Sequence, residues 1–224
     1  MTEFSADDTS IIVIEVLGTI AFAISGIRLA AAKRFDWFGA YVVGLVTAIG
    51  GGTLRDVLLD IPVFWMLSSR YLAVTGLSLL AVIIFKQALV RGMRTLFIFD
   101  AIGLALFVVV GIQKTIAVGY PMWVAIVMGI ITGSFGGVIR DILINEEPLF
   151  FRKDIYATAC LAGGIAYYLV SLTAAPIWVT QMTCAVTIIS LRILAVKYDW
   201  SLPILKVDAQ PISDKDPTKD EGKN

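Results

Sequence analysis

GGGTLRDVLL, at residues 50–59, and FGGVIRDILI, at residues 135–144, are near copies of each other, and the second begins 85 residues after the first. The same offset aligns residues on either side of these two segments. The aligned pairs include Glu15 with Asp100, Phe22 with Phe107, Thr47 with Thr132 and Tyr71 with Tyr156. Ordered matches at one offset over roughly 60 residues indicate an internal duplication.

The composition around the two segments is that of a membrane protein. Of the 224 residues, 58% are apolar and 16% are charged, whereas a soluble domain is usually about a quarter charged. The formal net charge of zero excludes a strongly basic nucleic-acid-binding surface. The chain has no histidine, and its isolated cysteines, Cys160 and Cys184, form no zinc or disulfide pattern. We therefore expect a protein of the lipid bilayer that is not an enzyme, carries no cofactor and binds no nucleic acid.

Seven apolar segments are candidates for membrane helices, which need about 20 residues each. They lie near residues 11–32, 38–59, 71–86, 95–113, 121–144, 155–172 and 177–196, and the third is short. The predicted fold class is all-α integral membrane, with seven transmembrane helices.

Each copy of the repeat contains three spans, and an odd number makes the second copy cross the bilayer in the opposite sense. We therefore expect an inverted 3+3 repeat plus a seventh helix. The expected divisions are a polar external N-terminus at 1–10, the first three-helix repeat at 11–94, the second, inverted repeat at 95–176, the seventh helix at 177–197, and a cytoplasmic tail at 198–224 whose polar sequence predicts disorder.

The basic residues predict the orientation, because cytoplasmic loops carry the excess of lysine and arginine. Fifteen basic residues fall on one predicted side, and only Arg55, Arg70 and Lys114 fall on the other. This split predicts an external N-terminus and a cytoplasmic C-terminus in a bacterial or archaeal cell (inner) membrane. Lys114 lies near the end of the fourth span, from which its side chain can reach the membrane surface.

Charged residues inside the spans are costly, at roughly 2.5–3.5 kcal/mol each, and persist where they are paired or face a watery cavity. The repeat supplies two matched sets: Glu15, Arg55 and Asp56 in the first copy, and Asp100, Arg140 and Asp141 in the second. We predict an ion pair between Glu15 and Arg55 near the external face, and an equivalent pair between Asp100 and Arg140 near the cytoplasmic face. Two interpretations stay open: the pairs either staple helices together or border a conduction path.

Small residues precede each charged pair, within the second and fifth spans. They are Gly50, Gly51 and Gly52 with Thr47 in one copy, and Gly133, Ser134, Gly136 and Gly137 with Thr132 in the other. An interior glycine costs about 1 kcal/mol relative to alanine, so such runs loosen a helix and free carbonyl oxygens that suit a cation. The alternatives are close helix packing for the glycines and bonds to a preceding carbonyl for the hydroxyls. We favour a pore or substrate site, without a fixed metal ion.

The paired GGGTLRD and FGGVIRD segments, the three-plus-three repeat and the seventh span resemble the prokaryotic TRIC family, the trimeric intracellular cation channels, over roughly residues 11–197. The same duplicated unit is also labelled a bacterial glycine-transporter domain. The resemblance implies a homotrimer with one pore per protomer, lined by the first, second, fourth and fifth spans, with kinks at the glycine motifs. It also implies conduction of monovalent cations, chiefly potassium. Phe135 departs from the pattern, since the first copy has Gly50 there, and suggests a bulky constriction in the cytoplasmic half.

Two functions therefore compete. The first is a passive potassium channel. The second is a secondary transporter for glycine or another small zwitterion, which an inverted repeat also suits.

Overall fold

The computed structural model describes residues 6–85, 93–152 and 155–203. The expected disorder of the tail beyond residue 203 lies outside these ranges, as do Lys86 and Arg91. Within them the chain forms seven α-helices and one 3-10 turn. They are α1 (Ala6–Ala32), α2 (Trp37–Leu58), α3 (Arg70–Ile84), α5 (Met93–Ala117), α6 (Met122–Leu143), the turn η1 (Leu149–Phe151), α7 (Ala157–Ser171) and α8 (Ile177–Lys197).

Five of these helices, α1, α2, α5, α6 and α8, are long and apolar enough to cross a bilayer. The other two, α3 and α7, have 15 residues each, which is about 22 Å at 1.5 Å per residue. They are the third helices of the two expected repeats, so the two short helices hold equivalent places. The all-helical membrane fold with seven helices is thus confirmed.

Helix ends repeat between the two halves as well. α2 ends at Leu58 and is followed by Asp60 in the left-handed conformation, with a φ of 55°. α6 ends at Leu143 and is followed by Asn145, with a φ of 56°. Aspartate and asparagine tolerate this conformation better than most residues. The same stop signal therefore closes α2 and α6, directly after their charged pairs.

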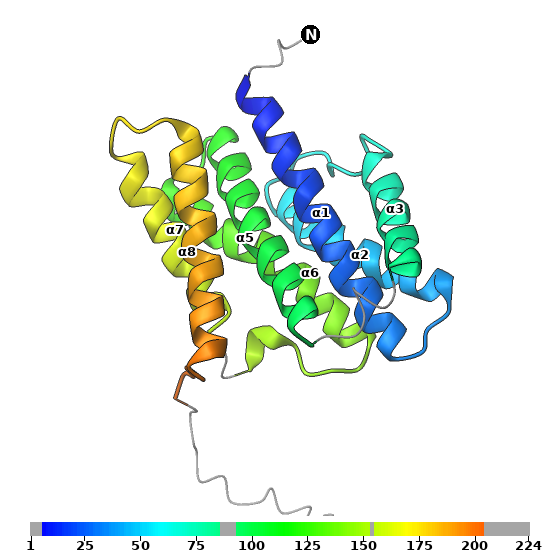
Figure 1. Ribbon diagram of the computed structural model, residues 1–224. Helices are drawn as coiled ribbons and strands as arrows, with labels where there is room; N and C mark the ends of the chain where they lie inside the picture. Colours follow the sequence, from blue (N-terminus) through cyan, green and yellow to red (C-terminus); the bar gives the residue numbers. More distant parts are fainter. Residues whose placement is uncertain (1–5, 86–92, 153–154, 204–224) are drawn as a thin grey trace, which may run out of the picture.

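The helices α1, α2, α5 and α6 form the centre of the molecule, and α5 runs in the opposite direction to α1 (Figure 1). Phe22 of α1 stacks on Phe107 of α5, with ring centroids 5.3 Å apart. These two residues are equivalent in the repeat, so a residue from each half meets its own counterpart. That contact is what a pseudo-twofold axis between the halves requires.

The helices α2 and α6 cross so closely that no side chain fits between their backbones. A Cβ atom added at Gly51 would collide with the carbonyl oxygen of Thr132, and one added at Gly136 would collide with that of Thr47. These two contacts are equivalent under the repeat offset. Small residues allow such close approach of membrane helices, so Gly51 and Gly136 set the spacing of the two halves.

The seventh helix breaks the symmetry of the bundle. In the first half, α3 packs directly against α1. In the second half, α8 takes much of the corresponding place beside α5, and α7 packs mainly against α8 (Figure 1). The second half is therefore covered by a helix that has no partner in the first.

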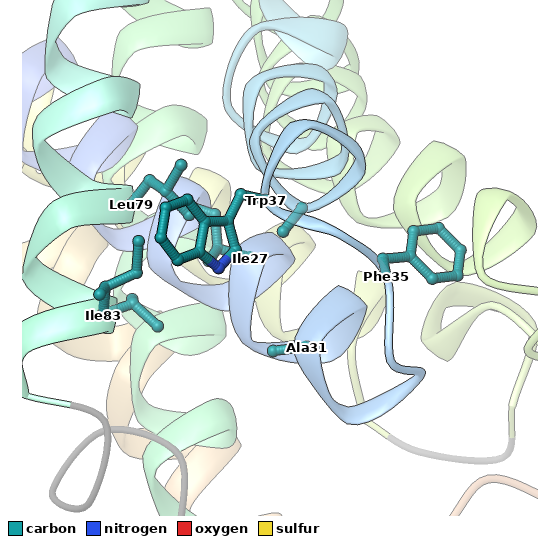
Figure 2. Close-up of a pocket in the computed structure, with 8 residues that line it drawn as sticks. Ile27, Ala31, Phe35, Trp37, Leu79 and Ile83 are labelled. Atoms are coloured by element: carbon teal, nitrogen blue, oxygen red, sulfur yellow. The ribbon is translucent and has the colours of Figure 1, made fainter.

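One apolar-walled cavity lies away from the charged residues. It has a volume of about 320 Å³ between α1, α2 and α3. Figure 2 shows the Trp37 ring beside Leu79 and Ile83 of α3, with Ile27 and Ala31 of α1 below. No charged residue lines this cavity, so it does not belong to the candidate site.

Candidate functional site

The charged residues gather in two clusters at opposite ends of the four central helices. We call them the Glu15 site (Glu15, Arg55, Asp56 and Lys114) and the Asp100 site (Asp100, Arg140, Asp141 and Arg192). Apart from Lys114, whose side chain is 23% exposed, every charged side chain in them is nearly fully buried. Each site contains two acidic and two basic residues, so each is formally neutral. Neutrality lowers the cost of holding four charges at membrane depth.

One structural element is the same in both sites. Arg55 Nε donates to Asp56 Oδ1 at 2.8 Å, and Arg140 Nε donates to Asp141 Oδ1 at 2.8 Å. The second oxygen of each aspartate accepts a backbone N–H eight residues further on, from Phe64 in one half and Leu149 in the other. Each aspartate thus fixes its neighbouring arginine and also fastens the loop that follows the helix.

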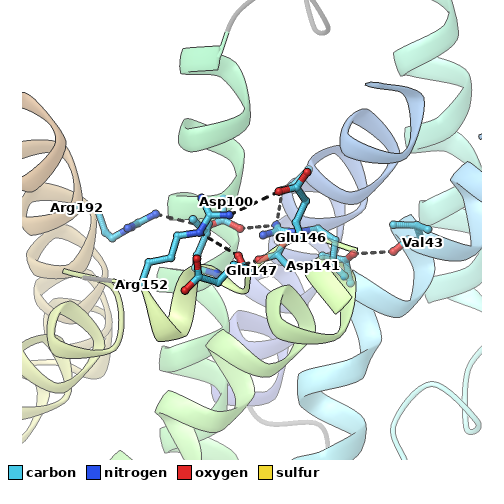
Figure 3. Close-up of polar contacts among 11 residues, drawn as sticks. Val43, Asp100, Asp141, Glu146, Glu147, Arg152 and Arg192 are labelled. Carbon is cyan, nitrogen blue, oxygen red and sulfur yellow. Dashed lines mark hydrogen bonds and ion pairs between the residues drawn. The ribbon is translucent and has the colours of Figure 1, made fainter. Parts of the chain in front are cut away.

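The Asp100 site contains the predicted ion pair. Arg140 Nη1 lies 2.6 Å from Asp100 Oδ1 and also donates to Ser25 Oγ at 2.8 Å. The ion pair expected between Asp100 and Arg140 is therefore present, and Arg140 connects α6 with α5 and α1. Figure 3 shows Asp100 and Asp141 in this cluster, with Arg192 approaching from the seventh helix.

Glu15 pairs differently from the prediction. Its carboxylate contacts Lys114 Nζ at 2.5 Å and accepts a hydrogen bond from Tyr71 Oη at 2.7 Å, while the ion pair of Arg55 is with Asp56. No direct ion pair joins Glu15 to Arg55 in the part of the chain that the structure describes. The physical reason is that Lys114, near the end of α5, approaches Glu15 directly and is its ion-pair partner.

An aromatic ring connects the two halves of the Glu15 site. The Arg55 guanidinium lies 5.7 Å from the centroid of the Phe64 ring, and the Lys114 ammonium lies 5.2 Å from it. Tyr71 meets the same ring edge-on, at 4.6 Å between centroids. The distances from Arg55 and from Lys114 to the ring are within the range of cation–π attraction, so Phe64 stabilises both of these cations.

The glycines named from the sequence lie within continuous helices, since α2 and α6 run unbroken through them. Gly51 and Gly136 form the crossing, and added Cβ atoms at Gly52 and Gly133 would collide with Phe64 and with Val108 and Leu104 of α5. The added Cβ would lie 3.0 Å from Ile139 at Gly50 and 3.2 Å from the Tyr156 hydroxyl at Gly137. Close packing is therefore the observed role of these positions.

The hydroxyl residues bond within their own helices. Thr47 and Thr132 donate to the carbonyls of Val43 and Met128, and Ser134 donates to that of Ile130. Phe135 is 36% exposed and lines an apolar cavity of about 190 Å³ with Phe150 and Phe151. Its ring thus lies outside the buried centre of the four helices.

Sequence reasoning missed Lys114 and Arg192 as members of the two sites, and it missed Tyr71 and Tyr156, which contact Glu15 and Arg192. The two tyrosines align in the repeat, and Arg192 is a charge within an apolar span. A charge at membrane depth is by itself a sign of a functional or paired position, so Arg192 could have been found from the sequence.

Comparison with known proteins identifies relatives over most of the chain. A family model described as "Glycine transporter" matches residues 12–87 and again residues 97–172. The UPF0126 inner membrane protein YadS of Escherichia coli K12 is 40% identical over 201 residues, which cover 87% of this chain and 96% of that protein.

Solved structures of similar shape are cation channels. The trimeric intracellular cation channel orthologue from Rhodobacter sphaeroides is 31% identical, has a TM-score of 0.81, and aligns over 86% of this chain and 100% of that one. A structure that explains conductance through TRIC cation channels is 34% identical, has a TM-score of 0.78, and aligns over 88% of this chain and 98% of that one.

Proposed function

The chain belongs to the family described as "Glycine transporter", and on that premise we propose that it is a monovalent cation channel, chiefly for potassium, with one pore in each protomer of a homotrimer. The structural relatives are channels for cations at 30% identity or more, which supports the cation-channel function. The observation that carries the proposal is the pair of buried, formally neutral clusters at the two ends of α1, α2, α5 and α6.

The proposed path runs between these four helices, from one cluster to the other. Unpaired buried arginines would repel a cation, and the carboxylates of each cluster remove that barrier. We also propose that α2 and α6 bend at their glycine runs, because glycine has a lower helix propensity than alanine. In the proposed organisation, the chain consists of two three-helix repeats, a seventh helix and a terminal tail.

We propose that the N-terminus is external and the C-terminus cytoplasmic. The relative from Escherichia coli is an inner membrane protein, and the described helices suit a bilayer. The imbalance of basic residues supports the orientation. In this orientation the Glu15 site faces the outside and the Asp100 site faces the cytoplasm.

Single-channel recording from the purified protein in a planar bilayer tests the proposal. Ohmic potassium currents are expected, and they should persist when chloride is replaced by a large anion. Glu15→Gln should change the conductance because it removes a buried charge of the path. Glu147→Gln, at an exposed position, is the matched control and should leave the conductance unchanged.

The alternative is a secondary transporter for glycine or a similar zwitterion, and the description of the family favours it. Proteoliposomes loaded with buffer and given labelled glycine distinguish the two functions. Saturable glycine uptake without measurable potassium currents would replace the channel proposal with the transporter.

A further inference from the structure

Arg192 belongs to the Asp100 site although its helix lies outside the duplicated unit. Its side chain is 4% exposed, and its Nη2 lies 3.6 Å from Asp100 Oδ2. The guanidinium lies 4.6 Å from the centroid of the Tyr156 ring and 4.9 Å from that of Phe97. α8 thus places a buried cation against a carboxylate of α5.

The repeat explains why this cation comes from elsewhere. In the Glu15 site the second cation is Lys114, on α5. The offset of 85 residues places its equivalent at Leu29 on α1, which carries no charge. Without Arg192, the Asp100 site would contain two acidic residues and one basic residue. The seventh helix therefore supplies to the Asp100 site the charge that α1 of the first repeat lacks at Leu29.

The carboxylates of Glu15 and Asp100 differ in how closely their partners approach them. Both oxygens of Glu15 are occupied, one by Lys114 and the other by Tyr71. Asp100 Oδ1 is held by Arg140, and Asp100 Oδ2 lies 3.6 Å from Arg192, a longer contact than the 2.5 Å between Glu15 Oε1 and Lys114; neither Oδ2 nor Oε1 makes a hydrogen bond among the described residues. The Tyr156 hydroxyl, equivalent to that of Tyr71, also has none there. Asp100 is one methylene shorter than Glu15, and Arg192 is the ion-pair partner observed at its Oδ2.

We propose that Arg192 sets how strongly a monovalent cation binds at the Asp100 end of the conduction path, an inference that rests on the proposed channel function. Its charge offsets Asp100 Oδ2, which would otherwise attract a monovalent cation strongly in a site shielded from water. Arg192 thereby limits how long a cation stays at this end of the path. With a second cation at each end, from Lys114 and from Arg192, the wild-type current should stay close to ohmic, and removing one of the two cations should make the current depend on the direction of flow.

The test is single-channel recording of the full-length trimer with Arg192→Gln in symmetrical potassium chloride. The variant should saturate at a lower potassium concentration than the wild type, by about twofold or more, and its current–voltage curve should become asymmetric. Lys114→Gln, the matched change at the other end, should give asymmetry of the opposite sign. Lys197→Gln removes an exposed charge from the same helix and should change neither property.

Arg192→Lys separates charge from packing, since it keeps the charge and loses the planar guanidinium. It should restore most of the wild-type curve. If Arg192→Lys behaves like Arg192→Gln, or if Arg192→Gln conducts as the wild type does, the proposal is overturned.

If Arg192→Gln does not assemble, Asp100→Asn carries the test. It leaves the site positive and should lower potassium conductance, and an unchanged conductance contradicts the proposal. A wild-type protein without potassium current would instead reject the channel function itself. The two failures are therefore distinguishable.

Discussion

The Glu15 site and the Asp100 site occupy equivalent positions in the two halves, yet they reach neutrality by different routes. In the Glu15 site, the second cation is Lys114, from within the repeat, and Tyr71 donates a hydrogen bond to the Glu15 carboxylate. In the Asp100 site, the second cation comes from the added helix, and the equivalent tyrosine makes no hydrogen bond in the described structure. The comparison teaches that the arginine–aspartate pairs are the shared framework, and that the second cation is where the two ends of the molecule differ.

The two arginines provide the sharpest test of this difference. Arg140 contacts Asp100, Asp141 and Ser25, whereas the ion pair of Arg55 is with Asp56. We expect Arg140→Gln to destabilise the protein by about 3–5 kcal/mol, since it leaves buried carboxylates without their partner, and Arg55→Gln to cost less. Thermal unfolding in detergent, followed by fluorescence, measures both. Equal losses would show that the extra contacts of Arg140 contribute nothing.

The two tyrosines should respond differently to the loss of the hydroxyl group. Tyr71→Phe removes a hydrogen bond to the buried Glu15 carboxylate, which costs about 1.5–3 kcal/mol. Tyr156→Phe removes a hydroxyl that makes no hydrogen bond in the described structure and should be neutral or slightly stabilising. The same unfolding assay compares them, and the double variant should show additive effects because the sites lie at opposite ends.

The helix crossing should behave identically in the two halves. Gly51→Ala and Gly136→Ala each drive a methyl group into a backbone carbonyl of the facing helix, and we expect each to cost about 1–3 kcal/mol. Gly76→Ala is the matched control, because its nearest neighbour would be Tyr41 at 3.9 Å. That control should be neutral or stabilising through its higher helix propensity. Unequal costs at Gly51 and Gly136 would break the symmetry at the crossing.

The smallest effect is expected at a surface ion pair that joins the halves beyond the Asp100 site. Lys33 Nζ lies 2.5 Å from Glu146 Oε1, and this contact holds the pKa of the Glu146 carboxyl below its usual value. The pair therefore contributes stability at neutral pH and loses it as the pH falls through that lowered pKa. The melting temperature of Glu146→Gln should differ only slightly from that of the wild type at pH 7. The difference should disappear in acid and in about 1 M salt.

The sequence predicted the framework of the site and missed the parts that are not repeated. The offset between the two halves identified Asp100, Arg140, and the aspartates Asp56 and Asp141. Equivalent residues in an inverted repeat lie at the same depth from opposite faces of the membrane. The offset could not identify Lys114 or Arg192 as partners, because neither has a charged counterpart there. The composition predicted the membrane helices. It could not distinguish a glycine that lowers the stability of α2 from a glycine that lets the backbone of α6 pack against α2. That distinction depends on which backbone lies opposite, and only the structure shows it.

The crossing at Gly51 and Gly136 also records how such a molecule could arise. Two identical three-helix units, inserted into one membrane in opposite orientations, would form this crossing as a symmetric dimer, each glycine against the threonine carbonyl of its twin. In such a dimer, a substitution of the glycine would have disturbed both contacts of the crossing at once. Joining the units into one chain freed distant positions to diverge, as Glu15 did from Asp100 and Lys114 from Leu29. The crossing has the same glycine and threonine in both copies, because the glycine of each half still packs against the threonine carbonyl of the other half.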